Sequence, residues 1–268
     1  MTILDQIVNT KRQEVATALQ RRPVDELHRV MESIAPPRDF LEAVTGQGER
    51  TVHLIAEVKK SSPSAGVIVA DFDPVAIAKV YAASGASALS VLTDETYFQG
   101  HIDYIGRIKG AVSLPVLRKE FIIDEYQVYE SRAAGADAIL LISEILTLDE
   151  ISRFYAIARR LGMTVLIEGH SAPALTAVLD RLAPPQDHGY LIGINNRDLK
   201  AQATDVRTTV EIARALPPGT KFVSESGLHT RRDVETVAGA GACAILVGES
   251  LLKSSDIAAK MRTLVGHH

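Results

Sequence analysis

A short apolar run recurs eight times after residue 52, and this repetition leaves few folds possible. The runs read HLIAEVK, ASALSVL, LPVLRK, DAILLI, TVLIE, YLIGIN, KFVSE and ACAILVG. They begin at His53, Ala86, Leu114, Asp137, Thr164, Tyr190, Lys221 and Ala242. Each run has the length of one strand, and most are apolar enough to be covered on both faces, as strands of a parallel sheet are.

Helical patterns fill the intervals between these runs, for example at 74–83, 125–134, 149–161 and 230–240. The phrases SGASAL, AGADAI and AGACAI each place a glycine at the end of a helix and a small residue at the start of the next strand. Parallel neighbours need crossovers of this length. Eight such units in about 215 residues are typical of a (β/α)8 TIM barrel, whereas a doubly wound sheet rarely keeps so even a spacing. The sequence therefore predicts an α/β protein of this barrel type.

The first fifty residues follow a different pattern. Apolar residues recur at helical spacing over 4–19, a second helix is expected over 24–31, and a short helical piece over 39–44 follows a pair of prolines. We therefore expect residues 1–50 to form an N-terminal helical extension that belongs to the same domain as the barrel, residues 51–268.

Composition and charge exclude several classes of protein. The net charge is −4 and no long basic run is present, which argues against a nucleic-acid partner. No apolar stretch reaches the roughly 18 residues of a membrane span, and the N-terminus lacks the apolar segment of a signal peptide. The single cysteine, Cys243, allows no internal disulfide and is expected to be a core residue of the last strand. We expect a cytoplasmic protein without membrane partners, either a monomer or a weak homo-oligomer.

Ionisable side chains end the odd-numbered strands of the predicted barrel: Glu57 and Lys59 on the first, Lys119 on the third, Glu168 on the fifth and Glu225 on the seventh. The carboxyl ends of the strands form the active-site face of such barrels, and alternate strands fill one interior layer. These groups are therefore predicted to meet in one mouth, where burial permits the shifted pKa values that acid–base catalysis uses. One charged residue at a strand end is more often solvated than catalytic, but the matched set favours catalysis.

Other polar strand ends predict where an anion binds. Barrels of this type often hold a phosphate between the loops after strands seven and eight, which here read SESG and VGES. Gly227 and Gly248 would let backbone amides approach the anion, and a short helix is expected to begin at Ser250. Glu249 would repel a phosphate, so only its backbone is assigned to this site. The SSPS stretch at 61–64 adds hydroxyl groups.

Taken together, the segments AEVKKSSPSAG, SVLTDETYFQG, PVLRKEFIID, GADAILLI, IGINNRDL and SESG resemble those of the indole-3-glycerol phosphate synthase family of tryptophan biosynthesis. The resemblance covers essentially the whole chain, including PPRDFL at 36–41. It implies a carboxy-lyase that converts 1-(2-carboxyphenylamino)-1-deoxyribulose 5-phosphate, a small phosphorylated substrate, to indole-3-glycerol phosphate with loss of CO2 and water. It also implies that no metal or organic cofactor takes part.

The resemblance assigns roles to individual residues. Lys119 would be the general acid and Glu168 its partner acid or base, while the remaining catalytic positions are Lys59, Glu57 and Asn195. The predicted substrate-binding positions, with those from the phosphate loops, are Ser62, Phe121, Arg197, Glu225, Ser226, Gly227, Gly248 and Glu249. One departure from the family pattern is Glu120 in place of aspartate, which is expected to point away from Lys119 with little effect.

Several alternatives remain open at this stage. Phosphoribosylanthranilate isomerase is a barrel with a related substrate, but it uses a cysteine at the first strand end and an aspartate at the sixth, where this chain has Glu57 and Asn195. An aldolase could use Lys119 as a Schiff-base nucleophile. A non-catalytic phosphate-binding barrel would need no coordinated set of acids and bases.

Overall fold

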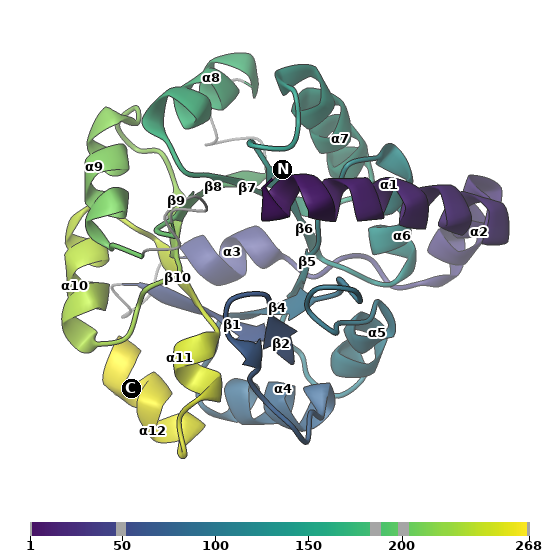
Figure 1. Ribbon diagram of the computed structural model, residues 1–268. Helices are drawn as coiled ribbons and strands as arrows, with labels where there is room; N and C mark the ends of the chain where they lie inside the picture. Colours follow the sequence, from purple (N-terminus) through teal and green to yellow (C-terminus); the bar gives the residue numbers. More distant parts are fainter. Residues whose placement is uncertain (1, 47–51, 183–188, 198–203, 267–268) are drawn as a thin grey trace.

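The computed structural model describes residues 2–46, 52–182, 189–197 and 204–266. Within these residues, eight parallel strands close into a barrel (Figure 1). The strands are β1 (His53–Val58), β4 (Ala88–Leu92), β5 (Val116–Lys119), β6 (Ala138–Ile142), β7 (Thr164–Gly169), β8 (Tyr190–Asn195), β9 (Phe222–Glu225) and β10 (Ala244–Val247). Because β1 pairs with both β4 and β10, the sheet has no free edge. Each predicted run coincides with one of these strands, and β7 extends one residue beyond its run, so the predicted barrel is confirmed.

Helices surround the barrel and follow its strands in turn (Figure 1). They are α4 (Pro74–Ala83), α5 (Asp103–Lys109), α6 (Glu125–Ala133), α7 (Leu148–Arg160), α8 (Ala172–Leu182), α9 (Arg207–Ala215), α10 (Arg231–Gly239), the short α11 (Glu249–Leu252) and α12 (Ile257–Val265). Capping boxes at Asp124, Thr147 and Thr230 explain why α6, α7 and α10 begin where they do. None of the described helices is both long and apolar enough to cross a bilayer.

Side chains alternate between the two faces of each strand. Inward residues such as Ile55, Leu117 and Leu166 form one apolar cluster inside the barrel. Their outward neighbours, such as Leu54 and Val165, belong to a larger cluster beneath the helices. This alternation confirms that the charged side chains two residues further along the odd strands share the inward face. Cys243 precedes β10 rather than lying within it, and it is half-buried against the interior cluster.

The N-terminal helices are α1 (Ile3–Arg21), α2 (Val24–Ser33) and α3 (Phe40–Thr45). Figure 1 shows α1 across the near end of the barrel, whereas α2 packs against α6 at the side. At the other end, Phe40 and Val44 of α3 are fully buried and join the interior apolar cluster. The predicted boundary between residues 50 and 51 lies outside the described residues, so the assignment of both parts to one domain stays a prediction.

The PPRDFL stretch joins this extension to the base of the barrel. The buried carboxylate of Asp137 accepts hydrogen bonds from the backbone amides of Arg38 (2.6 Å) and Val116 (2.8 Å), and it forms an ion pair with Lys109. The guanidinium of Arg38 donates to three backbone carbonyls between residues 109 and 114. A buried carboxylate is stable here because each of its oxygens is hydrogen-bonded.

A buried ion-pair cluster anchors α1 over the barrel mouth. Lys11, which is 3% exposed, contacts Asp94 at 2.8 Å and Glu120 at 3.2 Å. Burial disfavours the Lys11 ammonium, but Glu120 and Asp94 outweigh that penalty and raise its pKa. Glu120 points away from Lys119 as expected, and it also accepts a hydrogen bond from Thr93 at 2.7 Å. Its side chain thus ties the extension to the barrel.

We predict that Lys11→Met destabilises the protein by about 3–5 kcal/mol, because two buried carboxylates lose the cation that neutralises them. Burial already raises the pKa of Asp94, and loss of Lys11 raises it further; the pKa of Glu120, which is lowered in the intact cluster, also rises. Stability is then lost as pH increases through these values. The loss in denaturant melts should therefore be larger near pH 8 than near pH 5.

Adding Glu120→Gln to Lys11→Met should restore part of this loss, since one uncompensated charge is removed. The matched control is Lys79→Met, which removes an exposed lysine of α4. A Lys11→Met protein as stable as this control would contradict the anchoring role.

Candidate active site

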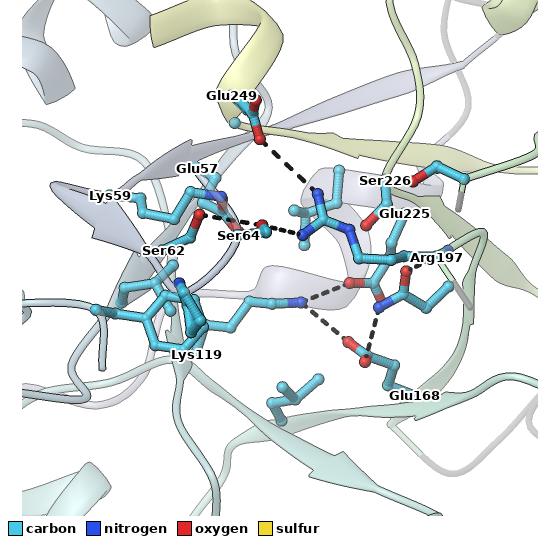
Figure 2. Close-up of a pocket in the computed structure, with 18 of the residues that line it drawn as sticks. Glu57, Lys59, Ser62, Ser64, Lys119, Glu168, Arg197, Glu225, Ser226 and Glu249 are labelled. Atoms are coloured by element: carbon cyan, nitrogen blue, oxygen red, sulfur yellow. Dashed lines mark hydrogen bonds and ion pairs between the residues drawn. The ribbon is translucent and has the colours of Figure 1, made fainter. Parts of the chain in front are cut away.

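A pocket of about 390 Å³ opens at the carboxyl ends of the strands. All thirteen predicted site residues line it, namely Glu57, Lys59, Ser62, Lys119, Phe121, Glu168, Asn195, Arg197, Glu225, Ser226, Gly227, Gly248 and Glu249. Figure 2 shows their polar groups converging from several strands. The barrel therefore brings the whole predicted set together, as closure of the sheet requires.

Lys119 of β5 lies at the centre of the pocket between two carboxylates (Figure 2). Its ammonium donates to Glu225 at 2.6 Å and to Glu168 at 3.0 Å. The other oxygen of Glu168 accepts a hydrogen bond from the side-chain amide of Asn195 at 3.0 Å. Strands β7 and β9 thus present carboxyl groups to one lysine, and Asn195 of β8, the strand between them, holds one of these groups.

The electrostatics of this cluster separate its two carboxyl groups. Burial opposes ionisation of Glu168, but Lys119, His170 and Asn195 outweigh it and lower its pKa. Burial raises the pKa of Glu225, and the negative charge of Glu168 adds to that increase despite the opposing effect of Lys119. Burial also disfavours charge on Lys119, yet the carboxylates Glu168, Glu225 and Glu57 raise its pKa. The site therefore holds a protonated lysine beside two carboxyl groups of different acidity.

Space for Glu225 depends on a glycine that sequence reasoning missed. A Cβ atom at Gly193 would lie 2.4 Å from Oε1 of Glu225, so any other residue would displace the carboxylate. This oxygen is buried and has no hydrogen-bond partner among the described residues. The glycine inside the YLIGIN strand could have indicated this contact, because a glycine within a strand often marks a place where another group approaches the backbone closely.

Glu57 and Lys59 form a second ion pair at the end of β1. Gly248 was predicted to let a backbone amide approach an anion, and the structure gives a second reason for a glycine at this position. A Cβ atom there would lie 2.3 Å from Oε1 of Glu57, so Gly248 makes room for this carboxylate. Both side chains of the pair are largely buried at the pocket wall.

Arg197 occupies the outer part of the pocket, after β8. Its guanidinium donates to the hydroxyl of Ser64 at 2.8 Å and lies 3.8 Å from the carboxylate of Glu249. Asn195 accepts a hydrogen bond from the Arg197 backbone amide at 3.0 Å, which links the two predicted residues. Ser64 belongs to the predicted SSPS stretch. The hairpin of β2 (Ser61–Ser62) and β3 (Gly66–Val67) encloses it.

The turn after β9 has a backbone that most side chains avoid. Ser226 and Gly227 have φ angles of 66° and 74°, in the left-handed region. Buried Asn196 stabilises the turn by donating to the carbonyl of Ser226 and to the hydroxyl of Ser224, both at 3.0 Å. Asn196 was not predicted as a site residue, because strand alternation turns its side chain away from the pocket that Asn195 faces.

One wall of the pocket is apolar. The rings of Phe98 and Phe121 lie 5.9 Å apart at an angle of 40°. Ile3, Leu4 and Ile7 of α1 also line the pocket. The sequence predicted a helix at these positions but not that it would cover the barrel mouth. This wall suits a flat apolar group next to the charged cluster.

In the part of the chain that the structure describes, no group of three or more histidine, cysteine, aspartate or glutamate side chains is arranged to hold a metal ion.

Comparisons with solved structures agree with the barrel. 3-Hexulose-6-phosphate synthase superposes with a TM-score of 0.63 at 15% identity, covering 80% of this chain and 98% of that one. Orotidine 5'-phosphate decarboxylase from Pyrococcus horikoshii superposes with a TM-score of 0.56 at 14% identity, covering 78% of this chain and 95% of that one. At these identities the similarity concerns the fold alone.

Sequence comparisons are more specific. The sequence model described as indole-3-glycerol phosphate synthase matches residues 4–264. A protein of that name from Albidiferax ferrireducens is 48% identical over 257 residues, covering 95% of this chain and 94% of its own. Another, from Geobacillus thermodenitrificans, is 45% identical over 264 residues, covering 98% and 97%. The chain therefore belongs to the indole-3-glycerol phosphate synthase family.

Proposed function

We propose that this pocket performs the reaction of the family, closing the pyrrole ring of indole-3-glycerol phosphate with loss of CO2 and water, and that the predicted residues act as follows. The observation that supports it best is the convergence of Lys119, Glu168, Glu57 and Lys59 beside an apolar wall. Acids and bases lie there next to a surface for an aromatic ring. A non-catalytic phosphate-binding barrel would not need this set.

Lys119 is assigned as the general acid of ring closure. The attack of an aromatic carbon on a ketone requires a proton at the ketone oxygen, and the raised pKa of Lys119 keeps its ammonium protonated at neutral pH. Loss of CO2 then restores the aromatic ring. A positioned proton transfer of this kind contributes roughly 10²- to 10⁴-fold in rate.

Dehydration needs an acid for the leaving hydroxyl and a base for the ring proton. Glu168 is ionised and held by Asn195, so it is suited to accept the proton. Lys59, paired with Glu57, provides a second ammonium in the same pocket. These four residues, together with Lys119, complete the proposed catalytic set.

The two ends of the pocket suit the two ends of the substrate. The aromatic moiety would pack against Phe121 and Phe98, within reach of the planar guanidinium of Arg197 for its carboxylate. The phosphate would lie at the loops after β9 and β10, near Gly227 and the backbone at Gly248. Ser62, Ser226 and the backbone of Glu249 line the same region.

The direct test is to incubate the protein with 1-(2-carboxyphenylamino)-1-deoxyribulose 5-phosphate and to follow formation of the indole by its fluorescence. Turnover supports the proposed function, and its absence with folded protein contradicts it. The monomeric or weakly oligomeric state and the cytoplasmic location stay predictions.

We predict that Lys119→Ala retains substrate binding but loses about a hundredfold or more in kcat, because the acid is removed while the walls remain. Lys79→Ala, on the outer face of α4, is the control and should be unchanged. Near-normal turnover by Lys119→Ala would refute the assignment. Borohydride treatment of the wild type with substrate should trap no adduct, which separates acid catalysis from a Schiff-base mechanism.

We also predict that Glu168→Gln lowers kcat by about 10²-fold without unfolding the barrel, since the amide can still accept a hydrogen bond from Asn195 but cannot take up a proton. With that charge gone, the pKa of Glu225 should fall toward its ordinary value, which would shift the pH–rate profile. The control is Glu211→Gln on the exposed side of α9. An unchanged kcat and an unchanged profile would exclude Glu168 from proton transfer.

A further inference from the structure

The cations of the pocket differ in how firmly they are paired. Lys119 has two carboxylates within 3.0 Å, and Lys59 forms a close pair with Glu57. Among the described residues, the ion pair of Arg197 is longer: its guanidinium lies 3.8 Å from Glu249. Its other side-chain contact is the neutral hydroxyl of Ser64. Arg197 is therefore the pocket cation that an incoming anion can most easily engage.

The carboxylate of Glu249 lies between two cations. It accepts a hydrogen bond from Lys253, one turn along the chain, at 2.6 Å on one side, and it faces Arg197 on the other (Figure 2). The hydrogen bond from Lys253 is the main cause that lowers the pKa of Glu249, and the charges of Lys59 and Arg197 act in the same direction. Glu249 is thus ionised at neutral pH, with 28% of its side chain exposed on the pocket wall.

We propose that the Glu249 carboxylate is an internal competitor for Arg197, which releases the guanidinium when an oxyanion of the substrate binds. The inference rests on the proposed function, because it concerns the same pocket and the same substrate. It gives the Glu249 side chain a role beyond its backbone, as a specificity determinant against small free anions.

The physical reason is the number of contacts that a ligand can offer. A free phosphate or carboxylate ion must overcome the negative charge of Glu249 with one contact to Arg197. The intact substrate also contacts the apolar wall at Phe121 and carries a second anionic group. The cost of displacing Glu249 is therefore a smaller fraction of its total binding free energy.

The test uses isothermal titration calorimetry at low ionic strength, with inorganic phosphate and with anthranilate (2-aminobenzoate) as separate probes. Glu249→Gln should bind at least one of them about two- to fivefold more tightly than the wild type, since a repulsive charge is lost. A gain for anthranilate supports the assignment of Arg197 to the aromatic carboxylate, whereas a gain for phosphate alone would assign Arg197 to the phosphate instead. The gain should shrink as salt is added.

Glu235→Gln is the matched control. It also removes the acid of an i,i+4 ion pair, that of Glu235 with Arg231 at 3.0 Å, but on α10 outside the pocket lining. It should leave both affinities unchanged. If Glu249→Gln gains for neither probe, or gains no more than Glu235→Gln, the proposal is wrong.

Lys253→Met tests the competition from the other side. Loss of the 2.6 Å contact frees Glu249 to approach Arg197, so anion binding should weaken in the wild-type background and weaken less in the Glu249→Gln background. An equal effect in both backgrounds would contradict the competition.

These titrations do not depend on turnover, so the two proposals can fail separately. If the wild type turns over the substrate but Glu249→Gln leaves anion affinities unchanged, only the competition is refuted. If the wild type shows no turnover, the proposed function is refuted and the titration result can still be interpreted.

Discussion

The ammonium of Lys119, held between the carboxylates of Glu168 and Glu225, is the interaction on which the site depends. A charge this deeply placed is tolerated only when opposite charges surround it, because desolvation of an unpaired ion costs several kcal/mol. The pairing spans strands β5, β7 and β9, so it exists only in a closed barrel. The charged cluster proposed for catalysis therefore forms only when the barrel is closed.

Two adjacent residues, Lys119 at the end of β5 and Glu120 directly after it, belong to two different ion-pair clusters. Lys119 points into the barrel and meets the catalytic carboxylates, whereas Glu120 points outward and meets Lys11 of α1. Strand alternation places these side chains on opposite faces. The same segment thus positions the general acid and anchors the helix whose apolar residues cover the pocket.

Much of this arrangement could be predicted because it follows from local patterns. Apolar runs of strand length, helical intervals and capping residues each depend on neighbours in the chain. The predicted site residues also share one rule, since they lie at the carboxyl ends of strands. The features that were missed are contacts between segments far apart in the chain: Gly193 of β8 makes room for Glu225 of the neighbouring β9, and Ser64 of the predicted SSPS stretch meets Arg197. No local pattern encodes the partner in either case.

Periodicity and chain order are properties of the sequence, so they were enough to predict the alternation of strands and helices, the inward face of each strand and the charged residues at the strand ends. Which side chains pair with one another depends on the three-dimensional structure. Only packing in space shows that α1 covers the mouth, that Gly248 leaves room for Glu57, and that Glu249 faces Arg197 rather than solvent. These contacts depend on distances between side chains far apart in the chain, which barrel closure sets.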